Sequence, residues 1–118
     1  MTSNEIIRVT NALDYLIATK SIFSYTITKT EFKIDIPAIK YSNVYLKVPL
    51  IGKFSVQVFF PKHNIPDFEK IIKGKLKTGG KRNYKTIYLY ESATVPSQTN
   101  IERIFVNAKV KMQTIGII

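Results

Sequence analysis

The sequence predicts a mainly β protein that folds as one domain. Apolar and polar residues alternate through most of the chain, which is typical of strands with one buried face. Short breaks separate the alternating runs, and no internal repeat, Ser/Pro-rich linker or low-complexity segment occurs. A chain of 118 residues, 45% of them hydrophobic, is long enough to bury its own core. We therefore expect a single domain over residues 1–118, in which residues 1–20 form an N-terminal extension, either a helix or an added strand.

The first predicted strand is long and bent, over residues 22–36. Its first half places Phe23, Tyr25 and Ile27 on one face. After Glu31 the alternation changes phase, and the apolar face becomes Phe32, Ile34 and Ile36. A change of phase inside one extended stretch indicates a bulge or a coiled strand.

Two further strands, over residues 43–50 and 54–60, are predicted to form a hairpin across a short break at residues 51–53. Their outward positions are Tyr45, Lys47, Gln57 and Phe59. The last two predicted strands cover residues 86–90 and 103–112. The second of these alternates with Ile104, Val106, Ala108, Val110 and Met112 inward.

One short helix is predicted over residues 66–73, between the third and fourth strands. Pro66 suits the first helical position, Asp67 and Glu69 favour the positive end of the helix dipole, and Gly74 can end the helix. The element order is then long strand, strand, strand, helix, strand, strand. This is the order of the OB-fold, a five-stranded Greek-key barrel with one short helix between strands three and four.

The charge balance narrows the class of partner. Eighteen Lys and Arg residues outnumber eight Asp and Glu residues, for a net charge of +10. A positive field of this size favours nucleic acid or another anionic surface. No apolar run is long enough to span a membrane, no signal peptide is recognisable, and the absence of cysteine excludes disulfides and thiolate metal sites. We expect a cytoplasmic protein that does not bind membranes.

The densest basic segment is KIIKGKLKTGGKRNYKTIYLYES, residues 70–92. Lysines and one arginine surround the Gly79–Gly80 pair, with no acid before Glu91. Such a segment can contact several phosphates and release their counterions. Because lysine predominates over arginine, contact with the phosphate backbone is favoured over reading of base edges. The predicted phosphate contacts are Lys47, Lys53, Lys73, Lys75, Lys77, Lys81, Arg82 and Lys85.

Aromatic residues that face away from the predicted core are, after the basic segment, the second feature that indicates nucleic-acid binding. Exposed rings beside a basic groove are the usual platform for unpaired bases. The predicted stacking residues are Tyr41, Tyr45, Phe59, Tyr84, Tyr88 and Tyr90. The same rings also suit packing against the N-terminal segment or against a second subunit.

Catalysis is not expected. The only histidine, His63, has no neighbour with metal-ligand spacing, and the acids are scattered along the chain. We therefore predict a protein that is not an enzyme and that needs no metal or cofactor.

Element order, basicity and outward aromatics over residues 20–114 resemble the OB-fold single-stranded-DNA-binding proteins, of the small kind encoded by lactococcal phages. The resemblance implies sequence-nonspecific binding of single-stranded DNA in phage replication and recombination. It also implies a homodimer or homotetramer in the host cytoplasm, with a recombinase as a candidate partner. The chain ends in KVKMQTIGII rather than in the acidic tail of bacterial members, so recruitment of partners by such a tail is not expected.

Two alternatives stay open at this point. An RNA-binding module of the cold-shock type has the same features, because a contact to a 2′-hydroxyl leaves no trace in the sequence. A structural phage assembly protein would use the outward aromatics as an oligomer interface.

Overall fold

The computed structural model describes residues 1–36, 39, 41, 43–61, 77–81 and 83–118. Two helices flank six strands in this part of the chain. The elements in order are α1 (Ser3–Ala18), β1 (Ser24–Ile27), β2 (Glu31–Asp35), β3 (Tyr45–Pro49), β4 (Phe54–Pro61), β5 (Thr78–Lys81), β6 (Tyr84–Ser92) and α3 (Gln98–Thr114). The helix predicted at residues 66–73 lies outside the described residues.

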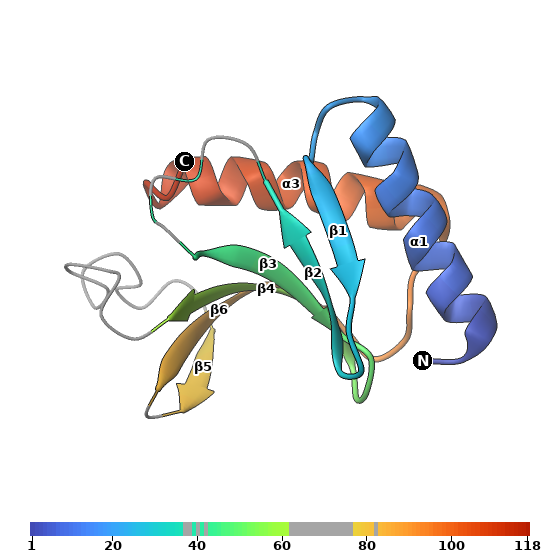
Figure 1. Cartoon of the computed structure of the whole chain (residues 1–118), viewed down its shortest axis with the longest axis horizontal. Helices are drawn as coiled ribbons and strands as arrows, with labels where there is room; N and C mark the ends of the chain where they lie inside the picture. Colours follow the sequence, from blue (N-terminus) through green and yellow to red (C-terminus); the bar gives the residue numbers. More distant parts are fainter. Residues whose placement is uncertain (37–38, 40, 42, 62–76, 82) are drawn as a thin grey trace.

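All six strands belong to one antiparallel sheet in the order β1-β2-β3-β4-β6-β5. The mainly β prediction is therefore confirmed. The sheet is strongly twisted, so that β1 and β2 run across the direction of β3 (Figure 1). Within the described residues β1 pairs only with β2, and β5 only with β6, which leaves the sheet open. The five-stranded closed barrel is not confirmed.

Residues 22–36 form a hairpin, which corrects the prediction of one long bent strand. The backbone N–H of Thr28 donates to the Glu31 carbonyl at 2.8 Å. The Thr28 hydroxyl in turn accepts from the N–H groups of Thr30 and Glu31, at 3.2 and 3.1 Å. A threonine that satisfies backbone groups two and three residues ahead stabilises a tight turn. The change of phase at Glu31 therefore marks a turn rather than a bulge.

Residues 103–112 are helical, which corrects the prediction of a final strand. Helix α3 begins after Ser97, whose hydroxyl accepts from the Asn100 N–H at 3.3 Å. The buried residues of α3 are Ile101, Ile104, Phe105, Ala108 and Met112, spaced three or four apart. Val106 and Val110, which the alternating pattern placed inward, are 52% and 55% exposed. Residues 103–112 taken alone fit both the two-residue period of a strand and the spacing of a helix. The cap at Ser97 and the buried Ile101, which precede this run, decide for the helix.

The N-terminal extension is a helix, which answers the choice left open by the sequence. Thr2 and Glu5 form a reciprocal capping box at the start of α1. The buried side of α1 consists of Val9, Ala12, Leu13 and Leu16. No helix in the described residues is both long enough and apolar enough to cross a membrane.

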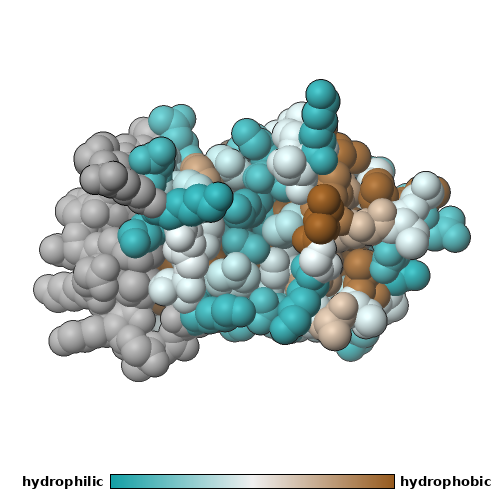
Figure 2. Space-filling model, turned by 90° about the horizontal axis from the view of Figure 1, so that it is seen from below, coloured by the Kyte–Doolittle hydropathy of each residue, from teal (hydrophilic) through white to brown (hydrophobic). Residues whose placement is uncertain are grey.

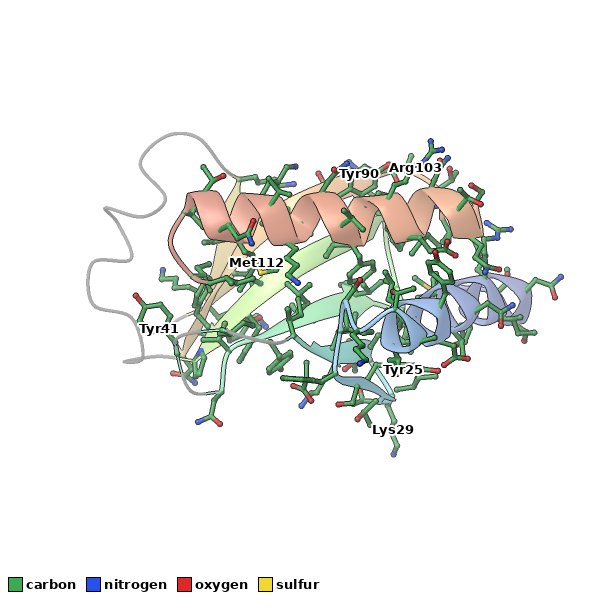
Figure 3. All side chains as sticks on the ribbon, turned by 90° about the horizontal axis from the view of Figure 1, so that it is seen from above. Tyr25, Lys29, Tyr41, Tyr90, Arg103 and Met112 are labelled. Atoms are coloured by element: carbon green, nitrogen blue, oxygen red, sulfur yellow. The ribbon has the colours of Figure 1, made fainter. Side chains whose placement is uncertain are left out.

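Both helices cover the same side of the sheet (Figures 1 and 3). Their buried residues join the inward side chains of β2, β3, β4 and β6 in one hydrophobic core. The Arg8 guanidinium of α1 donates to the carbonyl oxygens of Val95 and Pro96, at 2.9 and 3.2 Å, and so fixes α1 to the segment before α3. The opposite side of the sheet has no helix over it among the described elements, and we call it the open face.

Tyr25 connects the edge strand β1 to α1. Its hydroxyl donates to the Asp14 carboxylate at 2.6 Å. Burial, followed by this hydrogen bond, raises the pKa of Tyr25 from 10.0 to about 12. The folded state holds the phenolic proton more tightly than the unfolded state does, so the neutral phenol contributes to the free energy of unfolding. This contribution is complete below pH 10. It is lost as the pH rises from about 10 to about 12.

We predict that Tyr25→Phe lowers the free energy of unfolding by roughly 1–2 kcal/mol near neutral pH, because it removes a hydrogen bond to a charged group. The variant should also lose less stability than the wild type as the pH rises through 10. Urea unfolding across an alkaline pH series measures both effects. Tyr15→Phe, which changes an exposed ring of α1, is the matched control. An identical alkaline slope in the wild type and Tyr25→Phe would contradict the assignment.

Candidate nucleic-acid interface

Two rows of side chains cross the open face from strand to strand. The pairing register aligns Tyr45, Phe59, Thr86 and Gly79 in one row. It aligns Lys33, Lys47, Gln57 and Tyr88 in the next. Figure 2 shows the molecule from the side away from α3, where hydrophilic and intermediate surface covers the middle of the described part. This surface therefore differs in kind from the side that packs on the helices.

Three rings of the open face stack on one another, and we call Tyr45, Phe59 and Tyr84 the aromatic row. The centroids of Tyr45 and Phe59 lie 4.8 Å apart at an interplanar angle of 22°. Those of Phe59 and Tyr84 lie 5.2 Å apart at 29°. Thr86, directly opposite Phe59, is small and 2% exposed, so the Phe59 ring reaches the diagonal neighbour Tyr84 instead. The row joins three strands, β3, β4 and β6.

Stacking within the row decides which ring surfaces remain for a ligand. Phe59 has a ring on each side, whereas Tyr45 and Tyr84 each stack on one side only. A planar base can therefore extend the row at its Tyr45 or Tyr84 end without displacing a protein ring. All three rings are partly exposed. Burial, with a smaller effect of the Glu31 charge, raises the pKa of Tyr45, so its phenol stays neutral at physiological pH.

Lysines alternate with these rings. The Lys33 ammonium lies 5.2 Å from the Tyr45 ring centroid, and Lys47 lies 5.6 Å from Phe59 and 5.3 Å from Tyr84. Lys33 and Lys47 are also direct partners across β2 and β3. Like charges in directly opposite positions of a sheet are destabilising. Neither lysine forms an ion pair with an acid of the described residues, so their repulsion is left for a bound anion to relieve.

A third cation lies at the other side of the face. Lys77 pairs with Glu91, with Nζ 3.0 Å from Oε1, and lies 4.7 Å from the Tyr88 ring centroid. A side chain at Gly79 would begin 3.1 Å from the Tyr88 ring, so the glycine leaves the space that this ring occupies. Tyr88 is thus fixed between Lys77, Gly79 and its own strand. An exposed pair such as Lys77–Glu91 contributes at most about 1 kcal/mol, so Lys77 can exchange partners at low cost.

Acids also lie on this side of the sheet. Glu31 and Asp35 are on β2, and Asp35 accepts from the Ser24 hydroxyl at 3.1 Å. One oxygen of Glu31 is buried without a hydrogen-bond partner among the described residues. The positive part of the open face is therefore centred on Lys47 and the aromatic row rather than on β2.

The remaining predicted phosphate contacts are distributed differently. Lys81 is exposed at the end of β5, and Lys53 is exposed in the turn between β3 and β4. Lys85 alternates with Tyr84 and Thr86 along β6, so it points away from the open face. Lys73, Lys75 and Arg82 lie outside the described residues, as does His63.

Three predicted stacking residues, Tyr41, Tyr88 and Tyr90, do not join the aromatic row, and Tyr88 alone of these lies on the open face. Tyr41 and Tyr90 are partly buried against the hydrophobic core. Tyr90 packs edge-on against Phe54, with centroids 6.0 Å apart. A bulge in β6 turns Tyr90 to this side of the sheet. Val56 pairs with Tyr90 but Gln57 pairs with Tyr88, so Leu89 has no pairing partner in β4. Tyr88 and Tyr90 therefore lie on opposite sides of the sheet although they are two residues apart.

Lys33 is the functional candidate that the sequence analysis did not select. It stands between the buried Phe32 and Ile34, so alternation alone places it on the outward face of its strand. Its partnership with Lys47 depends on the hairpin at residues 28–31, which was interpreted as a bulge. A correct turn assignment would have brought the two lysines together.

Other sites offer less chemistry. No group of three or more His, Cys, Asp or Glu residues in the described ranges could hold a metal ion. A groove of about 520 Å³ between α1 and α3 is lined by Tyr15, Leu16, Glu102, Arg103 and Val106 among others. Its polar lining combines the Glu102 carboxylate and the Arg103 guanidinium with the hydroxyls of Tyr15, Thr19, Ser21 and Thr99, and contains no histidine or lysine. The open face thus remains the best candidate for a site.

Comparison of the chain with protein-family models, with curated proteins and with solved structures finds no match. The resemblance to OB-fold proteins therefore stays a prediction.

We predict a measurable coupling within the aromatic row. A double-mutant cycle of Tyr45→Leu and Phe59→Leu should give an interaction free energy of about 0.5–1.5 kcal/mol in urea unfolding, because each single change removes the same stacked pair. The control cycle combines Tyr45→Leu with Tyr88→Leu. In the described part of the structure the ring of Tyr45 stacks on Phe59 and the ring of Tyr88 contacts Lys77, so these two tyrosines form no stacked pair. Equal coupling in the two cycles would show that the rings of the row do not stack.

Proposed function

We propose that this chain binds single-stranded DNA without sequence preference, through the open face of its sheet. The observation that carries the proposal is the aromatic row with Lys33 and Lys47 beside it. Base–aromatic stacking contributes about 1–3 kcal/mol per base and tolerates every base, because each has a π face. The lysine ammonium groups next to the rings would contact the phosphates between stacked bases.

Geometry favours an unpaired strand over a duplex. The free ring surfaces lie at the ends of the aromatic row, and bases inside a duplex are already stacked on one another. Among the described residues, α1 has one basic side chain, Arg8, and α3 has three, Arg103, Lys109 and Lys111, which are too few for a typical helix in the major groove. On α1, the Arg8 guanidinium is bound to backbone carbonyls, and on α3 the Lys111 ammonium donates to the Leu89 carbonyl at 2.6 Å. On α3, exposed Arg103 stands next to Glu102 and on the same side as exposed Val106.

Absence of sequence preference follows from the types of residue on the face. Lysine contacts phosphate as a point charge, whereas bidentate reading of bases uses arginine, asparagine or glutamine. Gln57 is the one side-chain amide in the two rows, and its nitrogen already donates to the Ser55 hydroxyl at 2.8 Å. The proposed role is binding of exposed strands during replication or recombination, in the cytoplasm of a host cell if a phage encodes the chain.

We predict that Lys47→Glu weakens binding to oligo-dT about tenfold at low salt. It should also flatten the dependence of log K on log salt by about 0.7, the value expected for one lost phosphate contact on a single strand. Fluorescence anisotropy titrations over a salt series measure both quantities. Arg103→Glu makes the same charge change on exposed α3 and should leave the titration nearly unchanged. Equal losses in the two variants would reduce the attraction to net charge alone.

A second prediction separates stacking from charge. Tyr84→Ala removes one end of the aromatic row and should cost about 1–3 kcal/mol in oligo-dT binding, with the salt dependence retained. Tyr15→Ala, which removes an exposed ring from α1, is the control. Same-length RNA and a matched duplex complete the experiment. Tighter binding of the RNA would assign the site to RNA, and equal binding of the duplex would contradict the proposal.

A further inference from the structure

One acid of the open face contacts a lysine directly. Glu91 of β6 is paired with Ser55 of β4 in the register of the sheet. Its carboxylate accepts from the Lys77 ammonium at 3.0 Å through Oε1 and at 3.1 Å through Oε2. This is the only ion pair among the described residues. It joins β6 to the residue before β5, and these two strands lie at the end of the sheet away from α1 (Figure 1).

The contact of Glu91 with Lys77 resembles the contact that a phosphate would make. A phosphodiester, like a carboxylate, carries one negative charge on two oxygens. Lysine recognises either group as a point charge, without the planar geometry that arginine imposes. Two anions at the same ammonium repel each other, so a phosphate gains the full attraction of Lys77 only when the carboxylate has moved away.

The pair is accessible to a ligand and can open. The Lys77 side chain is 58% exposed and that of Glu91 is 30% exposed. An exposed pair of this kind favours the closed arrangement by about fivefold at most. Once released, the Glu91 carboxylate turns into water, so no buried charge is left without a partner. Displacement of Glu91 by a phosphate is therefore energetically accessible.

Tyr88 keeps Lys77 on the open face independently of Glu91. The Lys77 ammonium lies 4.7 Å from the Tyr88 ring centroid, and the Lys77 carbonyl accepts from the Tyr88 N–H at 2.9 Å. Neither contact involves the carboxylate, so both persist when Glu91 leaves. Lys77 stands beside Tyr88, at the end of the row that contains Lys33 and Lys47. Its release would add a third unpaired charge to that row.

We propose that Glu91 is an internal competitor of the nucleic-acid phosphate. It holds Lys77 in the free protein, and a phosphate of the bound strand takes its place. The inference rests on the proposed function, because it assigns a role to an acid of the same face. Its consequence is that Glu91 lowers the affinity of the open face for a strand that reaches Lys77.

Glu91→Gln tests the proposal in anisotropy titrations with labelled oligo-dT over a salt series. The variant should bind about fivefold more tightly at low salt. The slope of log K against log salt should steepen by at most about 0.7, the value for one phosphate contact on a single strand. Glu102→Gln removes the same charge from α3, where the partner is Gln98 rather than a lysine, and should have a much smaller effect. Equal changes in the two variants would overturn the proposal.

Lys77→Gln decides whether the gain depends on the lysine. In this background Glu91→Gln should add no more than Glu102→Gln does, because no ammonium remains to be released. The same gain without Lys77 would assign the effect to repulsion between Glu91 and the strand, and would overturn the proposal. A wild type that does not bind oligo-dT would overturn the proposed function together with this inference. Normal wild-type binding that Glu91→Gln leaves unchanged would overturn the inference alone.

Discussion

The rest of this structure follows from one constraint: in the described part of the chain, helices cover only one of the two faces of the six-stranded sheet. A sheet has two faces, and the described part of this chain supplies two helices, both packed on one of them. The apolar residues of the strands must then point to that side, and the other side must be built from groups that tolerate water. The alternation of β2, β3, β4 and β6, and so the composition of the open face, is set by where the helices lie.

The rings on the open face are exposed to solvent on one side, and stacking on one another limits the apolar surface that they expose. Tyr45, Phe59 and Tyr84 would expose large apolar surfaces singly, but stacked they shield one another, and the ammonium groups of Lys33 and Lys47 lie against them. Cation–π contact contributes about 0.5–1 kcal/mol at exposed sites, which offsets part of the repulsion between the two lysines. The face can thus keep unpaired positive charge in the free protein and still fold.

Much of the sheet could be predicted from the sequence, because alternation identified β2, β3, β4 and β6 and the sides on which their residues lie, except for Tyr90 beyond the bulge in β6. The errors arose where a second pattern competes with alternation. Residues 103–112 also satisfy helical spacing, and only the cap at Ser97 reveals it. The turn at Thr28 depends on side-chain hydrogen bonds rather than on glycine or proline. In the candidate site, outward positions such as Tyr45, Lys47 and Phe59 were identified correctly, but strand pairing decides which of them meet, and a single sequence does not contain the register.

The extra residue at Leu89 divides β6 into two segments whose tyrosines face opposite sides of the sheet. Before Leu89 the tyrosines of the strand, Tyr84 and Tyr88, face the surface. After it Tyr90 packs against Phe54, and the Lys111 ammonium donates to the Leu89 carbonyl. Without that insertion Tyr84, Tyr88 and Tyr90 would share one side, and the core next to Phe54 would lack a ring. The bulge thus lets one strand present tyrosines to both sides of the sheet, so that a change to the surface rings Tyr84 and Tyr88 does not touch the contact between Tyr90 and Phe54.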